Sequence, residues 1–262
     1  MGMTESEMDF LIAKNEFIEH KTGFNFLRQH CGFREGKLHL LIGSTSSGKS
    51  TLVRSILFDY LERNPKKKAF LYLTEESDAD FKLGIAYSRK KIDTDRVVRY
   101  SEQDGQPSKE KLFHMIQKAS EENIRFLILD NLTTCQFYND KPFEYQSSFV
   151  KDLKTELTKH HVACFCIAHT STTANAGKAL LDGDSIRGNK SVSNLAEYLY
   201  CLEKMVSGNQ IGQAITLVKN RNHTADDYTF ILKFNRMTRL FNQDFAIPFE
   251  EFKQMYNKRN KL

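Results

Sequence analysis

The sequence contains no apolar run that approaches the about 20 residues needed for a membrane-spanning helix. Its first residues include Glu5, Glu7 and Asp9 and are too acidic for a secretory or transit peptide. Internal repeats and low-complexity tracts are also missing. We therefore expect a cytoplasmic protein with no membrane partner.

The five cysteines are odd in number and show no metal-binding spacing. This usage is typical of reduced cytosolic thiols rather than of a disulfide framework. Cys164 and Cys166 are close enough to suggest a metal or redox pair. They lie inside a continuous apolar run, residues 162–168, which favours buried strand positions instead.

A strong charge of one sign is absent as well, since 38 basic and 33 acidic residues give a net charge of +5. The basic residues are spread along the chain, so the composition allows nucleic-acid binding without arguing for it. The hydrophobic fraction of 40% is ordinary for a globular protein, and 262 residues can form one α/β domain with small appendages.

A phosphate-binding motif follows the first apolar strand pattern, residues 38–42. The spacing G-x-x-x-x-G-K-S is complete, and an amphipathic helix pattern follows it. In such a loop the backbone N–H groups surround phosphate oxygens, Lys49 contacts the β- and γ-phosphates, and Ser50 can bind Mg²⁺. We predict binding of a nucleoside triphosphate with Mg²⁺ by Gly43, Ser44, Thr45, Ser46, Ser47, Gly48, Lys49, Ser50 and Thr51, and the family resemblance described below implies that it is ATP.

Acidic residues follow two further apolar runs. Glu75 and Glu76 come just after residues 69–73, where a doubly wound sheet binds its ligands. Acids are also favoured at the start of a helix, and the sequence leaves both interpretations open. Asp130 ends the run at residues 126–129, about 80 residues after the phosphate loop, and is the candidate for ordering Mg²⁺.

Two polar stretches complete the pattern. Residues 131–145 are rich in turn-forming residues and predict a surface loop. His169 ends the apolar strand pattern at residues 162–168, and a long polar stretch, residues 170–190, follows it. Loops of this length are usually functional or mobile.

Several ordered motifs resemble the RecA-like P-loop ATPase core of DnaB/Twinkle-type replicative helicases, and they are also similar to RadA and KaiC. The resemblance covers about residues 22–241, and its motifs lie at residues 22–24, 43–50, 71–77, 127–130, 219–221 and 234–241. It implies an α/β fold with a mostly parallel central sheet, flanked by helices and closed by a C-terminal β-hairpin. We expect an N-terminal helical segment (1–21), a RecA-like ATPase domain (22–243), and a C-terminal helix with a basic tail (244–262).

The same resemblance implies roles for individual residues. Glu75 corresponds to the general base that activates water, with Glu76 as its partner or substitute. His169 corresponds to a γ-phosphate sensor. Lys219 and Arg221 correspond to a cationic tip that reaches into the nucleotide site of a neighbouring subunit, and on a strand they point the same way.

We therefore expect an ATPase that works as a ring motor, a hexamer, with helicase or translocase activity on single-stranded DNA in replication or recombination. The strand would be contacted by Lys178, Arg187 and Lys190, and a replication or loader protein is a possible partner. The alternative is a regulatory or remodelling ATPase like RadA or KaiC, whose nucleotide state switches assembly without unwinding. A small-molecule kinase is disfavoured because the sequence has no arginine-rich lid.

Overall fold

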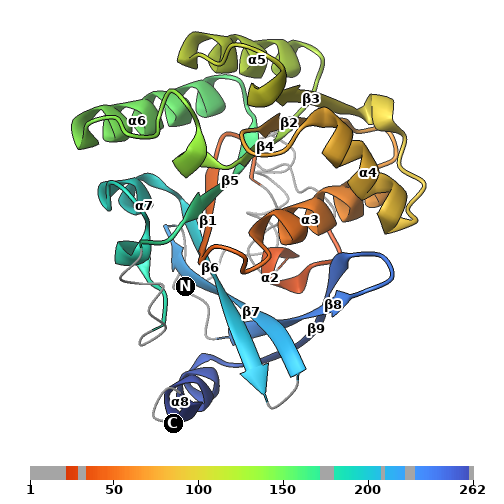
Figure 1. The fold of residues 1–262 in the computed structure, drawn as a ribbon. Coiled ribbons are helices and arrows are strands. Elements are labelled where there is room, and N and C mark those ends of the chain that lie inside the picture. The colour runs from red at the N-terminus through yellow and green to blue at the C-terminus, as the bar shows by residue number, and fades with distance from the viewer. Residues whose placement is uncertain (1–21, 29–33, 172–179, 208–209, 222–227, 260–262) are drawn as a thin grey trace, which may run out of the picture.

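The computed structural model describes residues 22–28, 34–171, 180–207, 210–221 and 228–259 (Figure 1). Within these residues a single sheet of nine strands runs in the order β3-β2-β4-β5-β1-β6-β7-β8-β9. The strands are β1 Leu38–Gly43, β2 Ala69–Leu73, β3 Val97–Ser101, β4 Phe126–Asp130, β5 Ala163–His169, β6 Tyr198–Ser207, β7 Gln210–Asn220, β8 Tyr228–Asn235 and β9 Leu240–Pro248. Strands β1 to β6 pair in parallel, and β6 to β9 pair antiparallel.

Helices cover both faces of the sheet (Figure 1). The α-helices are α2 Asn25–Arg28, α3 Lys49–Arg63, α4 Asp78–Ser88, α5 Lys109–Glu121, α6 Phe143–Lys159, α7 Ser191–Leu195 and α8 Phe249–Arg259. Residues of α3 and α4 share one hydrophobic cluster with the sheet, and residues of α5, α6 and α7 share the other. The predicted α/β class, with a mostly parallel sheet and a closing β8–β9 hairpin, is confirmed.

The central strand β1 shows how the apolar runs form this sheet. All six of its residues are buried. Leu41 packs in the cluster under α3, while Leu40 and Ile42 pack in the cluster under α5 and α6. A strand with helices on both faces needs apolar side chains on both sides, which explains a continuous apolar run in place of alternation.

The parallel register brings the ends of distant strands together. Gly43 at the end of β1 pairs with His169 at the end of β5. Leu73 at the end of β2 pairs with Asp130 at the end of β4. The phosphate loop, the two glutamates and Asp130 therefore meet at one edge of the sheet.

The expectation of a surface loop at residues 131–145 is wrong for residues 131–138, most of which are buried, whereas residues 140–145 are exposed. Leu132, Cys135 and Tyr138 are buried, and α6 already begins at Phe143. The physical reason is that Phe137 and Tyr138 pack inward, with the Tyr138 ring 5.8 Å from the ring of Phe149.

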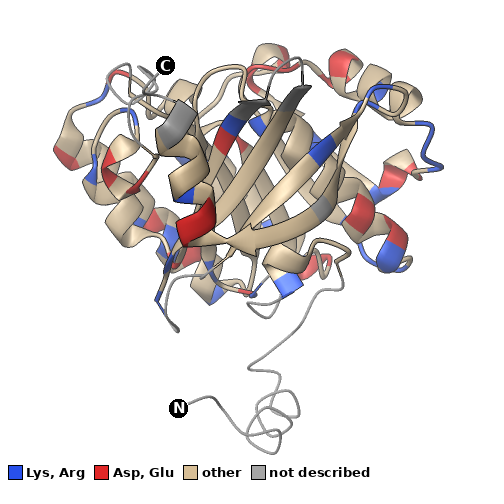
Figure 2. Cartoon of the chain, turned by 90° about the horizontal axis from the view of Figure 1, so that it is seen from below, with Lys and Arg blue, Asp and Glu red and all other residues tan. Residues whose placement is uncertain are grey.

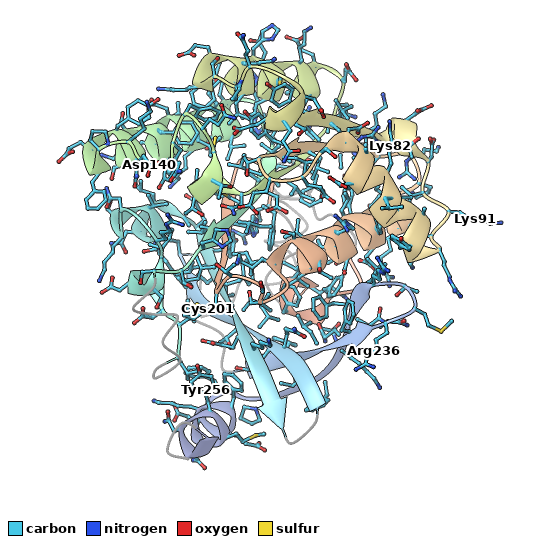
Figure 3. All side chains as sticks on the ribbon, in the orientation of Figure 1. Lys82, Lys91, Asp140, Cys201, Arg236 and Tyr256 are labelled. Carbon is cyan, nitrogen blue, oxygen red and sulfur yellow. The ribbon has the colours of Figure 1, made fainter. Side chains whose placement is uncertain are left out.

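Other expectations fall outside the described residues or remain predictions. Residues 1–21, with the expected N-terminal helix, lie outside them, as do Cys31 and Lys178. The division of the chain into three parts stays a prediction, and β9 continues past residue 243 to Pro248. The described cysteines are free and buried, and Cys201 on β6 is labelled in Figure 3. Among the helices that the structure describes, none combines the length and apolar character that crossing a bilayer requires.

Candidate nucleotide site

The phosphate loop connects β1 to the first turn of α3. Its backbone needs left-handed residues, with φ of 61° at Ser46 and 97° at Gly48. The Lys49 ammonium donates to the carbonyl oxygens of Gly43 at 2.9 Å and Ser44 at 2.8 Å. These two hydrogen bonds hold the Lys49 ammonium group against the phosphate loop.

The β8–β9 hairpin packs against the phosphate loop. A Cβ atom on Gly48 would lie 3.0 Å from the ring of Phe241, so only glycine fits here without displacement. The backbone N–H of Phe241 also donates to the hydroxyl of Ser55 on α3, at 2.8 Å. The β8–β9 hairpin is thus part of the structure that shapes the nucleotide loop.

The residues present fit a Mg²⁺-nucleotide complex. The Ser50 hydroxyl bonds to the Asp130 carboxylate, giving a pair of hard oxygen donors of the kind that Mg²⁺ prefers. Removal from bulk water raises the pKa of Asp130 to about 6, and the nearby Glu76 and Glu75 add to this effect. A bound cation would stabilise the ionised carboxylate and so offset the free-energy cost of burying its charge. The Ser47 hydroxyl is buried and has no hydrogen-bond partner within the described part of the chain, which leaves a polar group available to a phosphate.

The two adjacent glutamates face different surroundings. The Glu75 side chain is 51% exposed, and its Oε1 lies 3.2 Å from Asn131 Nδ2 and 3.4 Å from His169 Nε2. The Glu76 side chain forms an ion pair with Arg54 of α3. Glu75 is therefore the carboxylate left accessible beside the phosphate loop.

Asn131 is the site residue that the sequence interpretation missed. It is 1% exposed, and its Nδ2 lies 2.7 Å from His169 Nε2. Its only signal in the sequence is its place directly after Asp130. His169, which was predicted, lies in the same group, and burial and the nearby Lys49 lower its pKa.

The polar segment after β5 is attached to His169 through the backbone. The N–H of Arg187 donates to the carbonyl of His169 at 2.8 Å, and Thr170 forms an isolated antiparallel bridge with Ile186. Arg187 also lines a cavity of about 320 Å³ together with Thr133, Lys141 and Phe143. The loop that carries Arg187 is thus joined to the nucleotide edge.

Comparison with known proteins agrees with this geometry. Residues 30–175 match the family described as AAA domain. The chain belongs to this AAA domain family. A search of curated proteins finds no match.

The fold of this AAA domain is similar to that of a KaiC-like protein from the hyperthermophilic archaeon Pyrococcus horikoshii OT3. The TM-score is 0.65 at 14% identity, over 87% of this chain and 98% of that one. At this identity the likeness concerns the fold. Family, fold and loop geometry together identify a RecA-like P-loop ATPase.

The AAA domain match ends before Lys219 and Arg221. Lys219 donates to the carbonyls of Ser193 at 2.9 Å and Asn194 at 2.8 Å, and Arg221 donates to the same Asn194 carbonyl. The two side chains therefore point the same way, toward the end of α7.

These two cations lie far from the phosphate loop of their own chain. Gly43 pairs with Leu202 in the middle of β6, whereas Asn220 pairs with Tyr198, the first residue of β6. The intervening strand spans about 13 Å. Lys219 and Arg221 consequently sit at the sheet edge opposite the loop.

Proposed function

We propose that this chain hydrolyses ATP at interfaces between its own copies and uses the cycle to move along single-stranded DNA in the cytoplasm. The observation that carries the proposal is the place of Lys219 and Arg221, at the edge opposite their own phosphate loop. Lys219 and Arg221 lie on the same side of the chain at the end of β7, an arrangement that suits binding of a γ-phosphate. Because their own phosphate loop is at the opposite edge, this γ-phosphate would belong to a nucleotide bound by a neighbouring copy.

In this scheme the chain's own residues have separate tasks. Glu75 accepts a proton from water, the water oxygen bonds to the γ-phosphorus, and the bond from that phosphorus to the β–γ bridging oxygen breaks as ADP leaves. Lys49, with Lys219 and Arg221 of the adjacent copy, stabilises the charge that develops. Mg²⁺ held near Ser50 and Asp130 would neutralise phosphate charge.

The strand would lie on the loop that follows His169. Arg187 and Lys190 are exposed on this loop, and Arg187 lines a cavity with Lys141 and Phe143. Cations beside an exposed aromatic ring suit a phosphate backbone with stacked bases. The backbone bond from Arg187 to His169 would connect strand contact to the nucleotide edge.

The test is the ATPase rate with and without single-stranded DNA, together with the mass of the assembly. We expect stimulation by the strand and a ring, hexameric in our proposal, when an ATP analogue is present. A rate that the strand leaves unchanged, with no binding at low salt, would reject the motor.

A regulatory or remodelling ATPase is the second candidate. Its support is the charge distribution, since Figure 2 shows Lys and Arg positions interspersed with Asp and Glu positions along the cartoon. ATPase activity that responds to a protein partner and never to a strand would favour it.

A further inference from the structure

The side-chain amide of Asn131 has a fixed orientation. Its Oδ1 accepts from the N–H of Thr133 at 2.8 Å and from the hydroxyl of the same residue at 2.7 Å. An oxygen is required there, because the backbone N–H of Thr133 can only donate. The amide nitrogen must then face the opposite way, toward Glu75 and His169.

Both hydrogens of that nitrogen have an acceptor. One points to Glu75 Oε1 at 3.2 Å, and the other points to His169 Nε2 at 2.7 Å. Because an amide nitrogen only donates, His169 Nε2 must accept. The imidazole is therefore neutral with its proton on Nδ1, and Nε2 has no hydrogen to donate to Glu75 in this arrangement.

The surroundings of His169 agree with a neutral ring. The charged groups that face it are Lys49 from α3, Glu75 from the end of β2 and Arg187 from the following loop. Burial and the two cations lower the pKa of His169, while Glu75 opposes them. His169 Nδ1 is buried and meets no partner among the described residues, so the assignment of the tautomer rests on the 2.7 Å contact between Asn131 Nδ2 and His169 Nε2.

The backbone of His169 belongs to the same network. Its N–H donates to the Thr133 hydroxyl at 3.1 Å, and its carbonyl accepts from Arg187 at 2.8 Å. Thr133 thus orients both the Asn131 amide and the His169 backbone. Through these bonds the position of Asn131 is tied to the loop that carries Arg187.

We propose that Asn131 is a positioning residue that holds the Glu75 carboxylate and the neutral His169 ring in fixed places relative to each other. The inference rests on the proposed role of Glu75 as the base in ATP hydrolysis. Asn131 itself touches no reacting atom. It acts by keeping Glu75 aimed at the water and by linking Glu75 to the sensor and its loop.

The direct test is Asn131→Asp, which keeps the size and the acceptor for Thr133 but removes both donated hydrogens. Asn123→Asp makes the same chemical change at an exposed position and serves as the control. We expect Asn131→Asp to lower kcat by about 10- to 100-fold, the usual effect of a displaced catalytic group. The Kd of a fluorescent ATP analogue should change by less than about threefold, because the phosphate loop is intact.

A spectroscopic readout separates positioning from a general structural effect. Imidazole ¹⁵N resonances, assigned with His169→Gln, should show the Nδ1–H tautomer of His169 in the nucleotide-free wild-type protein and its loss in Asn131→Asp. Unchanged kcat together with an unchanged tautomer would overturn the inference. So would an Nε2–H tautomer in the wild-type protein.

A second variant covers the case in which Asn131→Asp does not fold. Thr133→Val keeps the side-chain shape while removing the hydroxyl that orients the amide, and we expect a smaller fall in kcat and a mixture of tautomers. Normal kcat with a pure Nδ1–H tautomer would count against the inference. Measurement of the tautomer requires neither ATP hydrolysis nor DNA. If single-stranded DNA does not stimulate the ATPase, the motor proposal is rejected, and the tautomer measurement still tests this inference on its own.

Discussion

Arg54 on α3 forms an ion pair with Glu76, which lies between β2 and α4. The Ser101 hydroxyl also donates to the backbone carbonyl of Glu76, at 3.0 Å. Glu76 is therefore directed toward α3, and its neighbour Glu75 is directed toward Asn131 and His169. The sequence left the choice between these two carboxylates open, and the structure separates their environments.

We expect Glu75→Gln to reduce kcat by about 100-fold or more, since the water would lose its proton acceptor. Nucleotide binding should persist because the phosphate loop is unchanged. Glu76→Gln is the matched control, and it should keep kcat within about threefold. Steady-state ATPase assays and equilibrium binding measure both effects. Equal losses in the two variants would contradict the assignment of Glu75 as the base.

Mixing two inactive variants tests whether sites are shared. Arg221→Ala should be nearly inactive, because the charge on the γ-phosphate would lose its partner from the adjacent copy. When Arg221→Ala chains are mixed with Glu75→Gln chains, some interfaces combine an intact Glu75 with an intact Arg221. We expect activity to rise above that of either variant alone. An unrecovered mixture, with exchange of subunits verified by mass measurement, would argue against a shared site.

Gly48→Ala should weaken both the fold and nucleotide binding. The backbone φ of 97° is costly for alanine, and the added carbon would lie 3.0 Å from the Phe241 ring. We expect a loss of about 1–2 kcal/mol in the free energy of unfolding, measured by urea denaturation. Gly212→Ala is the control, because the nearest atom to its Cβ would be 3.9 Å away. Equal stability of Gly48→Ala and wild type would show that the loop adopts another conformation.

Glu203 on β6 gives a prediction about pH. It is 7% exposed, accepts from the N–H of Leu181 at 2.6 Å, and burial raises its pKa to about 7. The folded state then holds this proton at pH values where the unfolded chain has released it, so stability falls as pH rises from about 4.5 to 7. Glu203→Gln removes that dependence and keeps the acceptor.

The free energy of unfolding gained by Glu203→Gln should be near zero at pH 4.5 and reach about 3 kcal/mol at pH 8. This figure follows because each unit of pKa shift corresponds to about 1.4 kcal/mol. Thermal and urea unfolding at several pH values measure the difference. Glu121→Gln, at an exposed position, should stay within about 0.5 kcal/mol throughout. A constant difference across the pH range would show that Glu203 does not titrate as described.

The sheet and the phosphate loop could be predicted because their signals are local. Residues 38–42 and 126–129 are short apolar runs of the kind that only a doubly covered parallel strand requires, and the loop motif has a fixed spacing. Residues 131–145 gave a misleading signal, because their polar composition hides aromatic side chains that pack inward. These side chains are buried because they pack against α6, and the local composition of a segment gives no information about such packing.

The finer arrangement of the site depends on contacts between distant residues. Glu76 forms an ion pair with Arg54, which lies on another element. Asn131 matters because Thr133 fixes its amide and because β2 and β5 bring Glu75 and His169 to it. Neither relationship follows from the spacing of these residues along the chain.

The opposed positions of the phosphate loop and the Lys219–Arg221 tip give each copy a direction. If every tip serves the loop of the next copy, the contacts repeat head to tail and produce a closed circle or a polar filament. An open array then has two unlike ends, one with a loop that no tip reaches and one with a tip that serves no loop. Turnover per chain would consequently rise with protein concentration until the circles close.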